Sequence, residues 1–189
     1  MSGQTIDEPV LAALLRYWDA KRADGPMPAR HAIDPLEMGG GLLPHLMLCD
    51  LYDRGTRVRF RLVGTTVVRR FGFDPTGRFL ADQPRSSYFD LMGALHRVLY
   101  CERAPLYSES VFCWGARRRL EARHLLLPLT NGGPDPAIAL LGISFASDTP
   151  FPPLLRSLNT IAQYCETHRS VVSLTAPRAW QAQRGRNVA

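Results

Sequence analysis

The sequence predicts an α+β domain: a five-stranded antiparallel sheet with helices on one face and a flanking helix at each end of the chain. The order of the patterns carries this prediction. Two strand-like runs come first, a long helical period follows, and three apolar runs separated by turn residues come last. Strands grouped in this way and joined by short turns pair as antiparallel neighbours, whereas a parallel sheet needs a long crossover between its strands.

Residues 1–43 are expected to form an N-terminal helix and a connector. Apolar residues recur at helical spacing over residues 7–22, and Thr5 followed by Glu8 fits a capping box. Two prolines and a glycine fall within residues 24–28, and this stretch cannot continue a helix.

Residues 44–147 are expected to form the central domain. The domain opens with a hairpin of two strands, at residues 46–52 and 57–62, around a turn at residues 53–55. The second strand alternates arginines with apolar residues, which is typical of a half-buried strand.

Two helices are expected to follow the hairpin. The first is short: it follows Gly64, is capped by Thr65 or Thr66, and is ended by Gly72. The second spans residues 86–103, where apolar residues recur on one face.

Three further strands are expected at residues 106–114, 118–129 and 137–145, with glycine and proline turns between them. The middle strand is apolar on both faces, because Leu125 and Leu127 lie opposite the other apolar set. Either the N-terminal helix or a partner subunit is therefore expected to cover the second face of the sheet.

The end of the chain is expected to form a helix and a tail. Leu154, Leu158 and Ile161 share one helical stripe, which predicts a C-terminal helix over residues 148–170. Residues 171–189 combine proline, arginine and glutamine with little periodicity, so a mobile tail is predicted there.

Composition argues against several classes of function. No apolar run approaches the roughly 20 residues of a membrane span, and the N-terminus lacks the layout of a signal peptide, so a cytoplasmic location without membrane contact is expected. The 4 cysteines form no C-x-x-C pair, and no cluster of carboxylates or metal ligands converges. We therefore predict no catalytic residue and no metal site, and the sequence names no cofactor.

Several short motifs can be compared with a known family. They are YWDAKR at residues 17–22, PMPAR at 26–30, IDPLEM at 33–38, LLPHLMLCD at 42–50, FRLVGTTVVRRFGFDPTGR at 60–78 and PLYSES at 105–110. The chain resembles PAS domains over about residues 11–145, and it is most similar to a bacterial family of small stand-alone PAS proteins. The resemblance implies a sensing or interaction role in bacterial signal transduction. It names no ligand, since PAS domains bind haem, flavins, small organic acids or nothing.

A ligand site is expected between the inner face of the sheet and the helices that follow the second strand. Nine side chains are expected to face it: Phe60, Leu62, Leu91, Leu95, Phe112, Leu120, His124, Leu126 and Leu140. The alternative is a filled core, because the same residue types would fill the interior of any small domain.

Two histidines are candidates for polar recognition. His96 lies on the long helix, where haem-binding PAS domains carry their iron ligand, but its place at the edge of the apolar stripe favours contact with solvent. His124 alternates in phase with Leu126, so its imidazole is expected to point inward. Its partner would be a ligand carboxylate or the hydroxyl of Ser108 or Ser110.

The predicted function is a non-catalytic sensory or regulatory module that binds a partner protein, a second copy of itself or a small ligand. A homodimer is expected through the N-terminal helix and the outer sheet face, where Leu125 and Leu127 alternate outward. The alternatives are a sensor of haem or another small molecule and an enzyme with an unrecognised pocket. Nucleic-acid binding through arginines, such as those at residues 117–119, has the least support.

Overall fold

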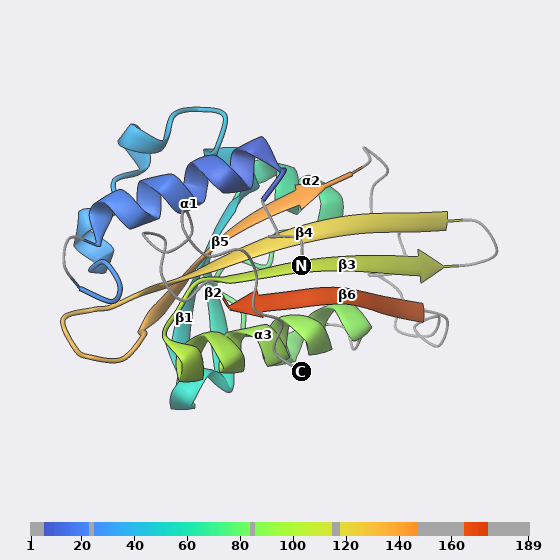
Figure 1. The fold of residues 1–189 in the computed structure, drawn as a ribbon. Helices are drawn as coiled ribbons and strands as arrows, with labels where there is room; N and C mark the ends of the chain where they lie inside the picture. The colour runs from blue at the N-terminus through green and yellow to red at the C-terminus, as the bar shows by residue number, and fades with distance from the viewer. Residues whose placement is uncertain (1–5, 23–24, 84–85, 115–117, 147–164, 174–189) are drawn as a thin grey trace, which may run out of the picture.

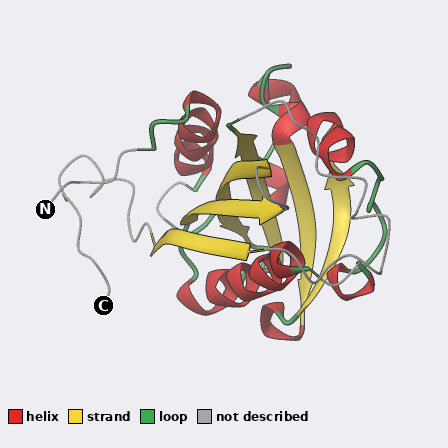
Figure 2. Ribbon diagram, turned by 90° about the vertical axis from the view of Figure 1, so that its right-hand side faces the viewer, coloured by secondary structure: helices red, strands yellow, loops and turns green. Residues whose placement is uncertain are grey.

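The computed structural model describes residues 6–22, 25–83, 86–114, 118–146 and 165–173. A six-stranded sheet in the order β2-β1-β5-β4-β3-β6 forms its centre, and every neighbouring pair is antiparallel (Figure 1). Helices pack on both sides of the strands, as the turned view in Figure 2 shows. We call the face covered by α2 and α3 the inner face, and the face covered by α1 the outer face.

Five of the strands confirm the predicted sheet almost residue for residue. Their bounds are β1 (Leu46–Tyr52), β2 (Arg57–Val63), β3 (Leu106–Trp114), β4 (Arg118–Leu129) and β5 (Ile138–Phe145). The β1–β2 hairpin turns through Asp53–Gly55, where Arg54 and Gly55 both have positive φ angles. The described residues also form the α-helices α1 (Pro9–Lys21), α2 (Thr65–Phe71) and α3 (Ser87–Glu102).

The beginnings of two helices differ from the prediction. Helix α1 begins at Pro9 with Glu8 as its N-cap, so a capping box with Glu8 at the third helical position is wrong. The N-cap of α2 is Gly64, and no side chain caps this helix. A β-carbon on Gly64 would collide with the carbonyl oxygens of Leu43 and Pro44, so close backbone packing takes the place of a threonine cap.

The other predicted helix ends are confirmed. Gly72 ends α2 with a φ of 72°, the left-handed conformation that a glycine adopts without strain. The hydroxyl of Ser86 accepts the N–H of Phe89 at 3.3 Å and caps α3. The sequence therefore located α3, the long helix of the inner layer, to within a residue.

The C-terminal helix predicted over residues 148–170 is wrong in its last part. Residues 165–170 belong to β6 (Cys165–Ser173), which pairs antiparallel with β3 at one edge of the sheet. Residues 147–164 and 174–189, which hold most of the predicted helix and tail, lie outside the described residues. An exposed β3 edge offers unpaired backbone groups to an adjoining strand, and residues 165–173 pair with it.

Helix α1 covers the outer face of the sheet, which confirms one of the two predicted covers. A close approach to β5 makes this possible: a β-carbon on Gly142 would lie 2.6 Å from Leu14 Cδ2 and 2.8 Å from Leu11 Cδ2. Leu125 and Leu127 on β4 are 0% exposed beneath this layer. The dimer expected through those two leucines therefore loses its basis, because the chain's own helix already buries them.

The inner face carries the second core. Helix α3 packs against β3 and β4, and buried residues of α2 and α3 belong to one core cluster. Phe71 of α2 meets Tyr88 and Phe89 of α3 edge-on, at centroid distances of 5.6 and 5.9 Å. This inner core is the layer in which a ligand site was expected.

Candidate functional site

Most of the described residues expected at the site do lie on the inner face. Four apolar members belong to the inner core, and His124 on β4 is 0% exposed. These four are Phe60, Leu91, Leu95 and Leu126. Phe112 and Leu120 pair with each other between β3 and β4, but their side chains lie outside the described residues.

Leu62 was wrongly expected on the inner face. The β1–β2 register shifts at this point, because Cys49 pairs with Phe60 whereas Leu48 pairs with Leu62, leaving Arg61 as an extra residue. Such a bulge reverses the alternation beyond it. Leu62 consequently lies on the outer side of the edge strand, with 46% of its surface exposed.

Leu140 was also assigned to the wrong face. Its neighbours Ala139 and Leu141 belong to the inner core, whereas Leu140 packs in the outer core beneath α1. Strand β5 is buried on both faces and carries a single polar side chain, Ser144, so alternation cannot identify which of its apolar residues face inward.

Four buried polar side chains gather on the inner face and form what we call the inner polar cluster. The cluster consists of His96 on α3, His124 on β4, and Ser108 and Ser110 on β3. Each is at most 1% exposed. His124 lies directly opposite Ser108 in the β3–β4 pairing, and Ser110 lies opposite Ala122. The sheet therefore holds three members side by side, and the packed helix supplies the fourth.

His96 is buried, so the prediction of a solvent-facing histidine is wrong. Its Nδ1 lies 2.6 Å from the carbonyl oxygen of Met92, one helical turn earlier. Because a carbonyl only accepts, Nδ1 carries the proton and Nε2 keeps its lone pair. Burial lowers the pKa of His96 to about 4, although the bond to Met92 opposes this shift. Nε2 has no hydrogen-bond partner among the described residues.

His124 points inward as predicted, but it bonds to neither serine. Both of its ring nitrogens lack a hydrogen-bond partner among the described residues. Burial is the larger cause that lowers the pKa of His124 to about 3, and electrostatic repulsion from His96 is the smaller cause. This coupling places the two imidazoles within electrostatic reach of each other. The ring of Tyr88 lies beside His124, with the centroids 5.7 Å apart.

The sequence predicted Ser108 and Ser110 only as hydrogen-bond partners for His124. Their hydroxyls are buried and, like the histidine nitrogens, have no partner within the described chain. A signal for their position existed: Ser108 and Ser110 alternate in phase with Leu106, which belongs to the inner core. Buried polar atoms normally find hydrogen bonds, so several orphaned atoms in one place mark the cluster as a candidate binding site.

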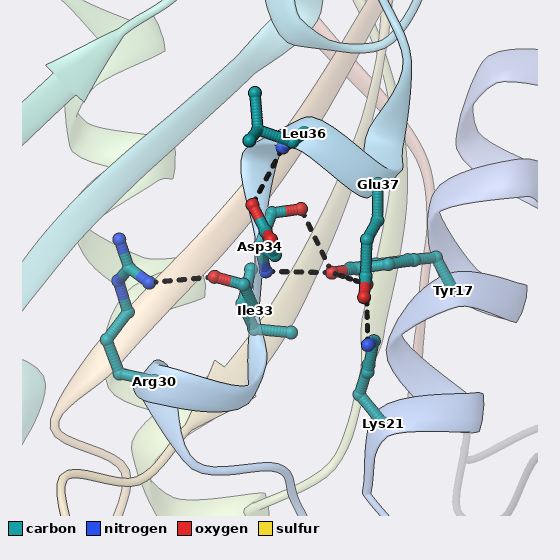
Figure 3. Close-up of polar contacts among 7 residues, drawn as sticks. All are labelled: Tyr17, Lys21, Arg30, Ile33, Asp34, Leu36 and Glu37. Carbon is teal, nitrogen blue, oxygen red and sulfur yellow. Dashed lines mark hydrogen bonds and ion pairs between the residues drawn. The ribbon is translucent and has the colours of Figure 1, made fainter.

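A second group of polar side chains holds α1 to the connector (Figure 3). We call this group, formed by Tyr17, Lys21, Asp34 and Glu37, the outer clasp. The hydroxyl of Tyr17 accepts the N–H of Asp34 at 2.9 Å and can donate to the Glu37 carboxylate at 3.0 Å. Lys21 forms an ion pair with the same carboxylate. Next to Tyr17, the indole of Trp18 donates to the carbonyl oxygen of Pro128 at 2.9 Å. Two of the quoted motifs, YWDAKR and IDPLEM, thus meet in this clasp.

The alternating arginines of β2 all have contacts within the chain. Arg57 stacks on Phe79 at 4.2 Å from the ring centroid. Arg59 donates to the carbonyl oxygen of Gly77, and Arg61 pairs with Asp50 at 3.2 Å. The run at residues 117–119 lies outside the described side chains. These contacts account for the β2 arginines as parts of the folded edge strand.

Two kinds of site are absent from the ranges that the structure describes. No group of three or more histidine, cysteine or acidic side chains in those ranges is arranged to hold a metal ion. Within the same ranges, no helix is both long enough and apolar enough to cross a bilayer.

Comparison with known proteins identifies the family. A family model described as a PAS domain matches residues 6–144 of the 189-residue chain. The chain belongs to the PAS domain family. This match runs from the start of α1 into the last residues of β5 and includes the inner polar cluster, whereas β6 lies beyond it. Neither the curated proteins nor the solved structures yielded a match. Membership of the PAS family supports a sensory or regulatory module.

Proposed function

We propose that this PAS domain is a non-catalytic sensor that binds a small ligand at the inner polar cluster and signals through contacts with another protein. One observation carries the proposal: five buried polar atoms of the cluster lack hydrogen-bond partners among the described residues. They are His96 Nε2, His124 Nδ1 and Nε2, Ser108 Oγ and Ser110 Oγ. Leaving such an atom unpaired costs about 1–3 kcal/mol, so a ligand that pairs with them gains affinity.

The electrostatics of the cluster favour binding over catalysis. A general acid or base works best when its pKa lies near the working pH. Burial lowers the pKa values of His96 and His124 to about 4 and about 3, so both imidazoles are neutral and weakly basic at neutral pH. This observation supports a sensor and argues against the alternative of an unrecognised enzyme.

Strand β4 connects the inner polar cluster to α1 and is the route by which ligand binding would change the packing of that helix. His124 faces the cluster, and the next residue, Leu125, packs beneath α1 on the other face. A ligand that favours one arrangement of β4 would shift the packing of α1 by its difference in affinity for the two arrangements. The protein partner, a homodimer, the cytoplasmic location and the bacterial pathway remain predictions.

The proposal is tested by native mass spectrometry of the full chain purified from its own host without denaturation. A retained small molecule at one per chain is expected. The double variant His124→Leu, Ser108→Ala should lose it, while the exposed control His31→Leu should keep it. A wild-type mass equal to the bare chain, together with no thermal shift against a metabolite library, would contradict a ligand-binding function.

A haem sensor is the second candidate, and one contact favours it. Axial histidines commonly donate Nδ1–H to a backbone carbonyl and bind iron through Nε2, and His96 has this arrangement with Met92. Haem would supply gas binding or redox chemistry at the iron. An absorbance scan of the same preparation decides between the candidates: a Soret band lost in His96→Leu supports haem, and its absence removes haem.

A further inference from the structure

The tautomer of His96 restricts what can bind beside it. Nδ1 carries the proton because it bonds to the Met92 carbonyl, so the unpartnered Nε2 can only accept. A molecule that fills this position must therefore bring an N–H or O–H donor. A carboxylate has only acceptor oxygens and would place two lone pairs against each other.

The rest of the cluster needs both kinds of partner. A neutral imidazole has one donor nitrogen and one acceptor nitrogen, and both nitrogens of His124 are unpartnered within the described chain. The hydroxyls of Ser108 and Ser110 can each donate and accept. A ligand that meets His96 with a donor can thus meet the sheet side of the cluster with an acceptor.

Among the described residues, no fixed charge acts on either histidine of the cluster. The pKa shifts of His96 and His124 come from burial, the Met92 carbonyl and the other histidine. No carboxylate, guanidinium or ammonium among the described residues contributes to either shift. Burying an unpaired ion in such surroundings costs far more than burying a neutral polar group.

The layer around the cluster is apolar, and its floor is made of small side chains. Ser108, Ser110 and Ala122 are adjacent on β3 and β4, where leucines occupy neighbouring positions. Tyr88 and Leu95 of α3 belong to the same inner core, and the ring of Tyr88 lies 5.7 Å from that of His124. Small side chains on the sheet beside an aromatic ring suit a compact, flat molecule.

We propose that the inner polar cluster binds an uncharged molecule carrying a hydrogen-bond donor and an acceptor on a small apolar or aromatic frame, such as a carboxamide. The proposal rests on the proposed function and adds the chemical class of the ligand. The donor meets His96 Nε2, and the acceptor meets His124 or the two serine hydroxyls.

Benzamide and benzoate test this class, because they share one ring and differ in the amide nitrogen and the charge. Each is titrated to about 10 mM into the full chain labelled with ¹⁵N, at about pH 7.5, and followed by amide chemical shifts. Benzamide is expected to shift the amides of β3, β4 and α3 around the cluster with a Kd on the order of 1 mM, and benzoate is expected to leave them unchanged.

Variants assign the binding to His96. His96→Leu should abolish the benzamide shifts, His96→Gln should retain weaker binding because it keeps an acceptor oxygen, and the exposed control His31→Leu should leave them unchanged. A circular dichroism spectrum of each variant checks that it folds. If His96→Leu does not fold, Ser110→Ala takes its place and should weaken the benzamide shifts.

Two outcomes overturn the ligand class. One is benzoate shifting the cluster amides as strongly as benzamide; the other is benzamide shifting none of them. A carboxylate bound with a proton on His96 would reveal itself by a loss of affinity of about tenfold per unit rise in pH. If native mass spectrometry still finds a retained molecule, only the class is wrong; if it finds none, the proposed function fails as well.

Discussion

The two faces of the sheet both carry leucine-rich cores, but their polar side chains differ in how they are paired. On the outer side, the hydroxyl of Tyr17 and the indole of Trp18 both have hydrogen-bond partners. On the inner side, His124 and the two serines have none among the described residues. The outer polar groups hold α1 in place, whereas His124 and the two serines make no hydrogen bond among the described residues that would stabilise the ligand-free fold.

The presence or absence of hydrogen-bond partners distinguishes polar groups that stabilise the fold from polar groups that are available to bind a ligand. A polar group that is buried and paired stabilises or orients the fold, while one that is buried and unpaired destabilises it. Natural proteins tolerate such a cost mainly at sites that must bind or react. Substitutions on the two faces should therefore change stability in opposite directions, and four experiments examine that contrast.

The largest effect is expected on the outer face. Trp18→Ala removes a fully buried ring and its bond to Pro128, and should lower the free energy of unfolding by about 3–5 kcal/mol. Urea unfolding followed by circular dichroism measures the loss. Arg16→Ala on the exposed side of the same helix should change stability by less than about 0.5 kcal/mol. Equal losses would mean that α1 is not an integral part of the core.

The next effect is a pH dependence from the inner face. The pKa values of His96 and His124 are about 4 and about 3 in the folded chain, below that of an exposed histidine. Between about pH 6.5 and 4 the unfolded chain binds more protons, so stability falls as the pH falls, by up to about 1.4 kcal/mol per pH unit for each histidine.

Denaturant unfolding at several pH values between about 7 and 5 measures this slope. His124→Leu should make the slope shallower, and the exposed control His31→Leu should leave it unchanged. A wild-type slope that His124→Leu does not alter would show that His124 is already charged, or solvated, in the folded protein.

Two buried serines on the inner side should respond in opposite ways. Ser108→Ala removes an unpartnered hydroxyl and should raise the stability of the ligand-free chain by about 1–2 kcal/mol. Ser86→Ala removes the cap of α3 and should lower stability by about 1 kcal/mol. Thermal unfolding of both variants makes the comparison. A loss in Ser108→Ala would mean that a bound water or another group already satisfies this hydroxyl.

The smallest effect is expected at the outer clasp. Tyr17→Phe keeps the ring and deletes the hydroxyl that bonds to Asp34, which should lower stability by about 0.5–1 kcal/mol. Lys21→Ala should cost less, because its ion pair with Glu37 is exposed and weakened by salt. Unfolding at low and high salt separates the two contributions: a salt-dependent loss in Tyr17→Phe would assign its effect to the ion pair.

Sequence patterns predicted the fold better than the candidate site. Gly72, the helical period of α3 and the alternation over the first residues of β2 are local signals, and each was interpreted correctly. Placement on a face failed where the local signal was missing. Leu62 follows a bulge that only the pairing with β1 reveals, and Leu140 lies in a strand that is apolar on both sides.

By itself, the sequence determined the order of the elements up to β5 and the bounds of five strands, because propensity and periodicity act over a few neighbouring residues. Its motifs also showed the resemblance to PAS domains. The tertiary structure decided the rest. It paired β6 with β3, laid α1 over Leu125, and buried His96 beside His124, whose two ring nitrogens have no hydrogen-bond partner among the described residues. Those outcomes depend on contacts between residues far apart in the chain, and burial and hydrogen bonding are settled only when such residues meet.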